Sequence, residues 1–225
     1  MPHTDRDHAT ISVRTCGAAC VALFALIAWN VFHGAALPRL DVAAAGWFHR
    51  HARPALTDFF LVLTDVHSIA GMCVAGALLG AFFYHLGARR WLLLTAVAVP
   101  GGMLLNVLLK YAFTRARPVF ADPIRVLNTY SFPSGHTAAT TVFYGIVVAW
   151  LCRADGGASA PARRAGWVCA GLLMIALVGL SRIYLGVHFL SDVLAAQAES
   201  GAWLALCFAV LRPGAFPLSA NRSAL

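Results

Sequence analysis

Long apolar runs, separated by short breaks rich in Gly, Pro, Arg or Asp, dominate this chain of 225 residues. The first run, 16–37, has 22 positions. As a helix it would reach about 33 Å, enough to cross a bilayer core of about 30 Å. Five further runs follow, at 69–86, 91–113, 134–151, 166–180 and 189–211. We therefore predict an all-α protein, a six-transmembrane-helix integral membrane bundle.

The composition indicates that lipid is the solvent for much of this chain. Hydrophobic residues make up 60% of it and charged residues 12%, about half the share of roughly 25% that soluble domains carry. The six runs occupy most of the chain and leave no room for a second domain. We expect a cytoplasmic tail at 1–15, a six-helix membrane domain at 16–211 and a second cytoplasmic tail at 212–225.

Two segments near the N-terminus allow more than one interpretation. A cleaved signal peptide is an alternative for the first run, with cleavage at the alanines 43–45. The run is too long for a signal sequence, however, and it ends well before those alanines. Residues 39–58 mix charged and apolar positions, which is typical of an interfacial segment with Trp47 at headgroup depth. A short apolar piece at 59–63 then precedes the second run.

The arginines predict the orientation. An even number of spans puts both termini on one side of the membrane. That side would hold nine arginines and the other side five, not counting Lys110, Arg117 and Arg182, which belong to the motifs below. The positive-inside rule then places both termini in the cytoplasm. We expect a multi-pass protein of the inner membrane. The net charge of +8 is scattered between apolar segments, so nucleic-acid binding is not expected.

The first of three polar clusters ends the third run. Lys110 and Arg117 are seven residues apart, about two helical turns, so on one helix they would share a face with Asn106. Pro118 would end the helix there. Two cations at this depth could bind an anion. The alternative is a snorkelling pair that only marks the interface.

The second cluster opens the fourth run with Pro133, Ser134, Gly135 and His136. Proline and serine suit a helix start, and the glycine lets a ligand approach the backbone. The free amides and the dipole of such a terminus attract anions. His136 could give a proton to a leaving oxygen. The alternative is an ordinary helix cap with an incidental histidine.

The third cluster joins the last two runs. His188 and Asp192 are four residues apart, so on one helix they would stack on the same face. The carboxylate could hold the imidazole tautomer and free its other nitrogen to attack phosphorus. Arg182 offers a fork for phosphate oxygens. A metal site at His188 and Asp192 is the competing interpretation. It lacks a third ligand, and nearby cations would repel a divalent ion.

Taken together, the residues at 110–118, 133–136 and 181–192 resemble the three signature motifs of the type 2 phosphatidic acid phosphatase superfamily. The resemblance spans roughly 60–210 with no departure at a motif position. It implies a mechanism without metal or other cofactor. It also implies that His188 forms a phosphohistidine, that Asp192 orients His188, and that His136 is the general acid. The phosphate-binding set that it implies is Lys110, Arg117, Ser134, Gly135 and Arg182.

The resemblance implies a membrane enzyme that hydrolyses a phosphate monoester or diphosphate of a lipid at the outer face. Undecaprenyl diphosphate is the substrate we favour from the sequence. Phosphatidylglycerophosphate, phosphatidic acid, a lipid A phosphate and a phosphotransfer reaction remain open. A transporter or flippase is a remote alternative, because the charges gather at helix ends and no internal repeat is seen.

Other polar residues carry weaker signals. Asp65 and His67 lie near the start of the second run, where we expect structural, interfacial roles. Arg115 and Arg125 border the first cluster and could meet a second phosphate or a lipid headgroup. Interfacial positions are also expected for His33, His49, His51 and His85.

Overall fold

A computed structural model describes residues 3–34, 36–154 and 160–214. Within those ranges the chain is all-helical, with eight helices and no strand. The helices are α1 (His3–His33), α2 (Ala36–Arg50), α3 (Pro54–Val66), α4 (Ile69–His85), α5 (Arg89–Phe113), α6 (Gly135–Ala154), α7 (Ala160–Tyr184) and α8 (Leu190–Leu211). The prediction of an all-α membrane bundle is confirmed.

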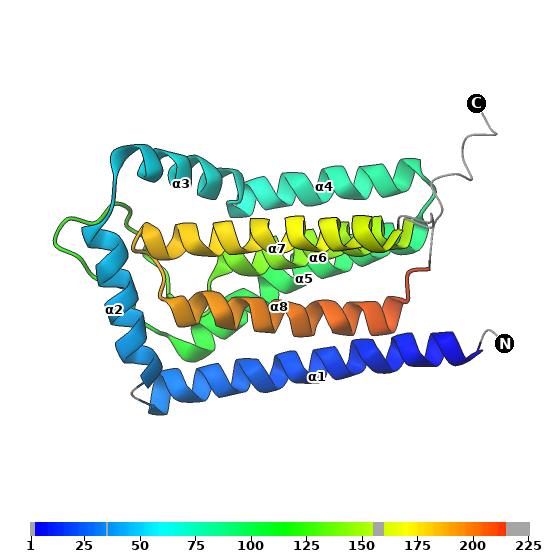
Figure 1. Ribbon diagram of the computed structural model, residues 1–225, viewed down its shortest axis with the longest axis horizontal. Helices are drawn as coiled ribbons and strands as arrows, with labels where there is room; N and C mark the ends of the chain where they lie inside the picture. The colour runs from blue at the N-terminus through cyan, green and yellow to red at the C-terminus, as the bar shows by residue number, and fades with distance from the viewer. Residues whose placement is uncertain (1–2, 35, 155–159, 215–225) are drawn as a thin grey trace.

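Most of the helices run side by side along the long axis, as Figure 1 shows. Five of the described helices are long and apolar enough to cross a membrane: the span Ser12–His33 within α1, and the whole of α5, α6, α7 and α8. A sixth crossing is made only if α3 and α4 count as one span, because they are bent by 52° at a short break. The predicted second span at 69–86 corresponds to α4, and the short apolar piece before it lies within α3.

The break between α3 and α4 has local causes. His67 follows α3, and its ring Nδ1 contacts the carbonyl oxygen of Leu63 at 2.8 Å, over the last turn of α3. Ser68 then starts α4, where its hydroxyl accepts a hydrogen bond from the Gly71 amide at 3.2 Å. At Gly71 the Ser68 hydroxyl thus takes the place of the backbone carbonyl that a continuous helix would have offered.

Several boundaries differ from the prediction. The first helix ends at His33 and not at 37, and it begins at His3, so residues 3–15 are helical where a polar tail was expected. The amide of Leu37 donates to the Asn30 side-chain oxygen at 3.0 Å, which ties the start of α2 back to the end of α1. Of the expected tail 212–225, only 212–214 lie within the described residues.

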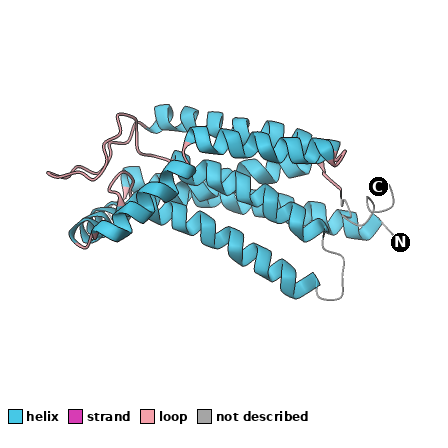
Figure 2. Cartoon of the chain, turned by 90° about the horizontal axis from the view of Figure 1, so that it is seen from above, coloured by secondary structure: helices cyan, strands magenta, loops and turns pink. Residues whose placement is uncertain are grey.

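The predicted interfacial segment forms α2 and the start of α3. Figure 1 shows α2 lying across one end of the bundle, at a steep angle to the long helices, and Figure 2 shows from above a long loop (pink) that projects from the same end. Trp47 on α2 is 51% exposed, as a side chain at headgroup depth would be. Asp41, on the same helix, is fully buried. The helix therefore has one face toward the bundle end, and that face carries a charge.

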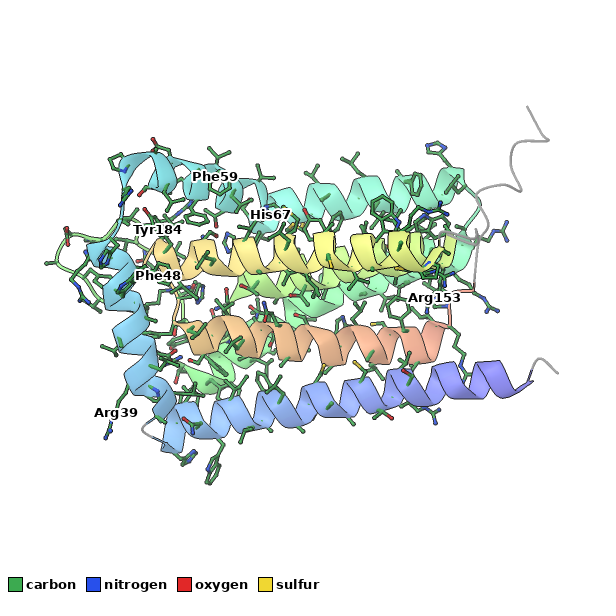
Figure 3. The ribbon with its side chains drawn as sticks, in the orientation of Figure 1. Arg39, Phe48, Phe59, His67, Arg153 and Tyr184 are labelled. Atoms are coloured by element: carbon green, nitrogen blue, oxygen red, sulfur yellow. The ribbon has the colours of Figure 1, made fainter. Side chains whose placement is uncertain are left out.

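The beginning of α1 and the end of α8 lie together at the end of the bundle away from α2 (Figure 1). There the buried rings of Phe83, Trp91 and Trp150 form the centre of an apolar cluster. Figure 3 shows Arg153 near this end and Phe48 and Tyr184 near the α2 end. The two connections that carry the predicted motifs, 114–134 and 185–189, both lie at the α2 end (Figure 1).

Candidate active site

The site lies at the α2 end of the bundle, where the end of α5, the starts of α6 and α8 and the end of α7 meet two connections. All eight predicted site residues belong to these segments. Gly186 in the 185–189 turn has a φ of +69°, and a Cβ there would meet the ring of Phe120 at 2.9 Å. Only glycine tolerates both conditions. The 114–134 connection can therefore pack closely over the turn that carries His188.

His188 is held between a carboxylate and a guanidinium. Its ring Nδ1 lies 3.4 Å from Asp192 Oδ2, and its Nε2 lies 3.1 Å from Arg117 Nη1. The same Asp192 oxygen accepts the Phe189 amide at 2.9 Å. The expected stacking on one helical face is wrong, because α8 begins at Leu190 and His188 precedes it. Asp192 instead reaches back over the free amides of the first turn of the helix.

Arg117 also reaches the site without the expected helix. Thr114, with a φ of +47°, ends α5 in a left-handed conformation, so the predicted helical stripe of Lys110 and Arg117 is wrong. The guanidinium donates to the carbonyl oxygens of Thr129 at 2.6 Å and Val187 at 2.5 Å. Backbone carbonyls of both connections therefore fix Arg117 against His188.

Lys110 holds the chain that leads into α6. Its ammonium donates to the carbonyl oxygens of Tyr130 at 2.8 Å and Pro133 at 2.7 Å. A Cβ on Gly135 would lie 3.8 Å from Lys110 Cε. Lys110 is thus next to the first turn of α6, where free backbone amides and the helix dipole favour an anion.

Ser134 and His136 flank that first turn. Ser134 is fully buried; its amide donates to the Asp192 carbonyl oxygen at 3.0 Å, and its hydroxyl contacts the Thr137 hydroxyl at 3.1 Å. The hydroxyl is therefore paired with a side chain where we expected an amide cap. His136 is half-buried, and Arg182 and His188 lie within electrostatic reach of its ring.

Arg182 has the least satisfied side chain of the site. It is fully buried, its Nη1 donates to the Thr64 hydroxyl, and its Nε and Nη2 have no partner among the described residues. Unpaired buried N–H groups are costly. A phosphate would satisfy them, because its oxygens match the fork of a guanidinium. The sequence reasoning missed Thr64, whose only signal was a polar position directly after the short apolar piece at 59–63.

Two of the weaker expectations change. Arg115 does not face a headgroup: its guanidinium lies 2.6 Å from Asp192 Oδ1 and 2.7 Å from Asp41 Oδ2. Asp41 was missed as well, because its partners lie 74 residues or more away in sequence. His67 is buried between helices, with Nε2 3.1 Å from the Tyr144 hydroxyl, and is not interfacial.

Arg125 and His49 tie the 114–134 connection to its surroundings. Arg125 lies 2.6 Å from Asp65 Oδ1 and is partly exposed. His49 lies 2.9 Å from the exposed Asp122, whose pKa the hydrogen bond to His49 lowers. Arg125 also lies within electrostatic reach of Arg182. A structural role for Asp65 fits its pairing with Arg125. The two pairs add two surface contacts to those that Arg115 and Arg117 make.

Burial and nearby charge together set the protonation of His188. Burial, followed by the nearby cations Lys110, Arg117 and Arg182, holds the pKa of His188 well below its usual value of 6.5. The imidazole is therefore neutral near pH 7, the form that can act as a nucleophile. Among the side chains that the structure describes (12–34, 36–154 and 160–214), no three of His, Cys, Asp or Glu gather as a metal site would require.

Known proteins share both the sequence and the fold. The sequence profile described as PAP2 superfamily matches residues 89–213. Phosphatidylglycerophosphatase B of Bacillus subtilis is 32% identical over 175 residues, which cover 76% of this chain and 83% of the relative.

Two crystal structures show the same fold. A transmembrane PAP2-type phosphatidylglycerolphosphate phosphatase from Bacillus subtilis superposes with a TM-score of 0.76 at 24% identity, covering 85% of this chain and 94% of that one. Aquifex aeolicus LpxE gives a TM-score of 0.59 at 21% identity, covering 75% and 94%. With more than half of its length matched by the profile, and with a relative that is 32% identical, this chain belongs to the PAP2 superfamily.

Proposed function

We propose that this PAP2-type membrane lipid phosphatase hydrolyses the phosphate monoester of phosphatidylglycerophosphate through a phosphohistidine at His188. One observation carries the proposal. A neutral imidazole, with Nδ1 on a carboxylate, stands beside Arg117 and near the buried, incompletely paired guanidinium of Arg182. That arrangement suits an attack on a bound phosphate.

The first step transfers the phosphoryl group to the protein. Phosphate oxygens bind Arg117, Arg182 and the first amides of α6, with Lys110, Ser134 and Gly135 shaping that end of the pocket. The lone pair of His188 Nε2 forms a bond to phosphorus as the bond to the lipid oxygen breaks. His136 gives its proton to that oxygen, and the lipid alcohol leaves. Asp192 stabilises the positive charge that develops on the imidazole.

The second step restores the protein. His136, now without its proton, accepts one from a water molecule as the water oxygen attacks phosphorus. The N–P bond breaks, its electron pair returns to His188, and inorganic phosphate is released. No step needs a metal or another cofactor, so we expect a chelator to leave turnover unchanged.

The choice of phosphatidylglycerophosphate rests on the relatives. A curated relative that matches three quarters of the chain carries that activity in its name, and so does one of the structures of the same fold. From the sequence we favoured undecaprenyl diphosphate, and one observation keeps it as the second candidate. Arg125 is a partly exposed cation within electrostatic reach of Arg182, where a second phosphate could bind.

The proposed orientation puts the site on the outer face of the inner membrane and both termini in the cytoplasm. The arginines at 89, 90, 153 and 212 support it, since they lie at the end of the bundle away from the site. Arg90 donates to the Arg212 carbonyl oxygen at 3.2 Å, and Arg153 lies over the Trp91 ring. The positive-inside rule places such an end in the cytoplasm.

Phosphate release from a panel of lipids tests this proposal. Purified protein is assayed on phosphatidylglycerophosphate, phosphatidic acid, undecaprenyl diphosphate and a lipid A phosphate, with and without chelator. We expect the highest kcat/KM on phosphatidylglycerophosphate and no effect of the chelator. A higher value on undecaprenyl diphosphate, lost in Arg125→Ala, would establish the second candidate instead. Release by His188→Ala at the wild-type rate would remove His188 from the mechanism.

A further inference from the structure

A buried ionic cluster links α2 to the site. It consists of Asp41 on α2, Arg115 after α5, and Ser191 and Asp192 on α8. The guanidinium of Arg115 lies 2.7 Å from Asp41 Oδ2 and 2.6 Å from Asp192 Oδ1. Both carboxylates are fully buried, and the side chain of Arg115 is 12% exposed. One guanidinium is therefore shared between two carboxylates, each held by a different nitrogen.

Asp41 also holds the start of α8. Its Oδ1 accepts the Ser191 amide at 2.9 Å, and its Oδ2 accepts the Ser191 hydroxyl. The Ser191 amide belongs to the first turn of α8 and has no partner within that helix. The same carboxylate that binds Arg115 thus caps the helix that carries Asp192.

The sharing of Arg115 decides what Asp192 can offer His188. Asp192 gives Oδ1 to Arg115 and keeps Oδ2 for the Phe189 amide and His188 Nδ1. An arginine released from Asp41 would be free to take both oxygens of Asp192, because its fork matches a carboxylate. That bidentate pair would compete with His188 for Oδ2.

The charges of the cluster lead to the same expectation. Two carboxylates and one guanidinium give a net charge of about −1 beside His188. Other titratable or charged groups act on the ring from α5, the 114–134 connection, α7 and α6, and they are Lys110, Arg117, Arg182 and His136. The cluster therefore supplies the negative charge that opposes these cations when the imidazole becomes positive.

We propose that Asp41 is a positioning residue for the reaction. By binding one nitrogen of the Arg115 guanidinium, it leaves Asp192 Oδ2 available to His188 and keeps the net charge of the cluster negative. The proposal rests on the proposed function, in which His188 is the nucleophile. Asp41 lies outside residues 89–213, which the PAP2 profile matches. The helix across the end of the bundle thus contributes to catalysis through Arg115.

Three variants and a matched control test the proposal. Asp41→Asn removes the charge at nearly constant size. Asp41→Asn combined with Arg115→Gln restores the net charge of the cluster and removes the competing fork. Arg115→Gln alone makes the cluster more negative. Asp58→Asn is the control, since it makes the same change at an exposed position on α3. Each protein is assayed for phosphate release, and its His188 protonation is followed by ¹⁵N NMR of labelled histidine, with His188→Ala for assignment.

We expect Asp41→Asn to lower kcat about 10-fold, as commonly follows when a residue that orients a site side chain is lost. KM should stay within about 2-fold of the wild-type value. The double variant should recover about 3-fold or more of that loss. His188 should protonate at lower pH in Asp41→Asn, because a negative charge is removed, and at higher pH in Arg115→Gln. Asp58→Asn should match the wild type in every measurement.

Two results would overturn the proposal. The first is an Asp41→Asn protein whose kcat and whose pH of His188 protonation both equal those of the wild type. The other is an equal loss of kcat in the single and double variants, accompanied by an equal loss of thermal stability, which is what a purely structural role predicts. If Asp41→Asn does not fold, Arg115→Gln decides, and an unmoved His188 titration contradicts the proposal. A wild type that releases no phosphate from any lipid contradicts the proposed function instead, and the NMR titrations still test the cluster.

Discussion

The two ends of the bundle differ in the side chains that fill their interior. At the end away from α2, Phe83, Trp91 and Trp150 pack ring against ring, with centroids 4.9 Å and 5.2 Å apart for the two Trp150 pairs. At the α2 end the interior holds ions, among them Arg182 and Asp192, both fully buried. Apolar packing stabilises a fold, whereas buried ions contribute little net stability. Substitutions at the aromatic end should therefore lower stability, and substitutions at the α2 end should lower catalytic activity.

The largest effect on catalysis should come from His188→Ala. Loss of a nucleophile commonly lowers kcat by about 10⁴-fold or more, while the thermal midpoint should stay within a few degrees of the wild type. His85→Ala is the matched control, since His85 is exposed at the end of α4. Phosphate release and thermal unfolding in detergent are measured together. A folded His188→Ala protein with more than about a tenth of wild-type kcat would refute the role.

The largest effect on stability should come from Trp91→Ala at the opposite end. Trp91 is 2% exposed and its ring N–H donates to the Gly214 carbonyl oxygen at 3.0 Å. Truncation of a buried Trp costs about 3–5 kcal/mol, yet kcat per folded molecule should stay within about 2-fold. Trp29→Ala, at a position 65% exposed, should cost less than about 1 kcal/mol. A selective loss of kcat in Trp91→Ala would show that the two ends are not independent.

A smaller effect should follow from Thr64→Val, which removes the hydroxyl that Arg182 donates to. Hydrogen bonds to charged groups contribute about 1.5–3 kcal/mol, so we expect kcat/KM to fall about 10-fold or more as the guanidinium loses its position. Thr57→Val makes the same change on α3, where the hydroxyl meets Tyr184 at 3.1 Å, and should leave kcat/KM within about 2-fold. Equal losses in both variants would point to a general disturbance of α3.

The pH dependence of kcat/KM should also respond differently to substitutions at the two ends of the bundle. Because burial and nearby cations hold the pKa of His188 well below 6.5, its imidazole stays neutral as the pH falls. If His188 is the nucleophile, as we propose, the acid limb of kcat/KM should lie below pH 6.5. Arg117→Met removes one of the cations that lower this pKa, so the limb should move to higher pH. The matched change Arg153→Met, at the other end, should leave the limb in place. An acid limb at or above pH 6.5 in the wild type would contradict a buried His188.

The smallest effect should come from Asp122→Asn. The side chain is 87% exposed, and its contact with His49 is a surface one, so kcat and the thermal midpoint should remain close to the wild type. Steady-state kinetics and melting curves check this. A marked fall in kcat would mean that the 114–134 connection depends on this contact to cover the site.

The sequence predicts the long helices better than the contacts between them. The runs at 91–113, 134–151 and 189–211 match α5, α6 and α8 within three residues, because lipid demands continuous apolar helices. The run at 69–86 matches α4, but α3 and the bend between the two helices were foreseen only as a short apolar piece at 59–63. The cause of the bend lies in side-chain caps at His67 and Ser68, which hydropathy does not register.

At the site, the sequence shows which residues meet but not how they meet. The three motifs locate the cations and histidines, since each motif stands at a helix end on the same side. The prediction that the motif residues share one face of a helix was wrong, because α5 ends at Phe113, before Arg117, and α8 begins after His188. The pairing of Arg115 with Asp41 joins positions 74 residues apart. Such a contact depends on the tertiary fold, which local spacing does not encode.

Trapping the phosphorylated protein tests directly whether His188 forms a covalent bond to phosphorus. Protein mixed with phosphatidylglycerophosphate is quenched in alkali within milliseconds and digested, and the peptides are analysed by mass spectrometry. We predict one phosphate on His188, stable in alkali and labile in acid. Phosphate on a different residue, or an unmodified His188 in protein that turns over, would contradict it.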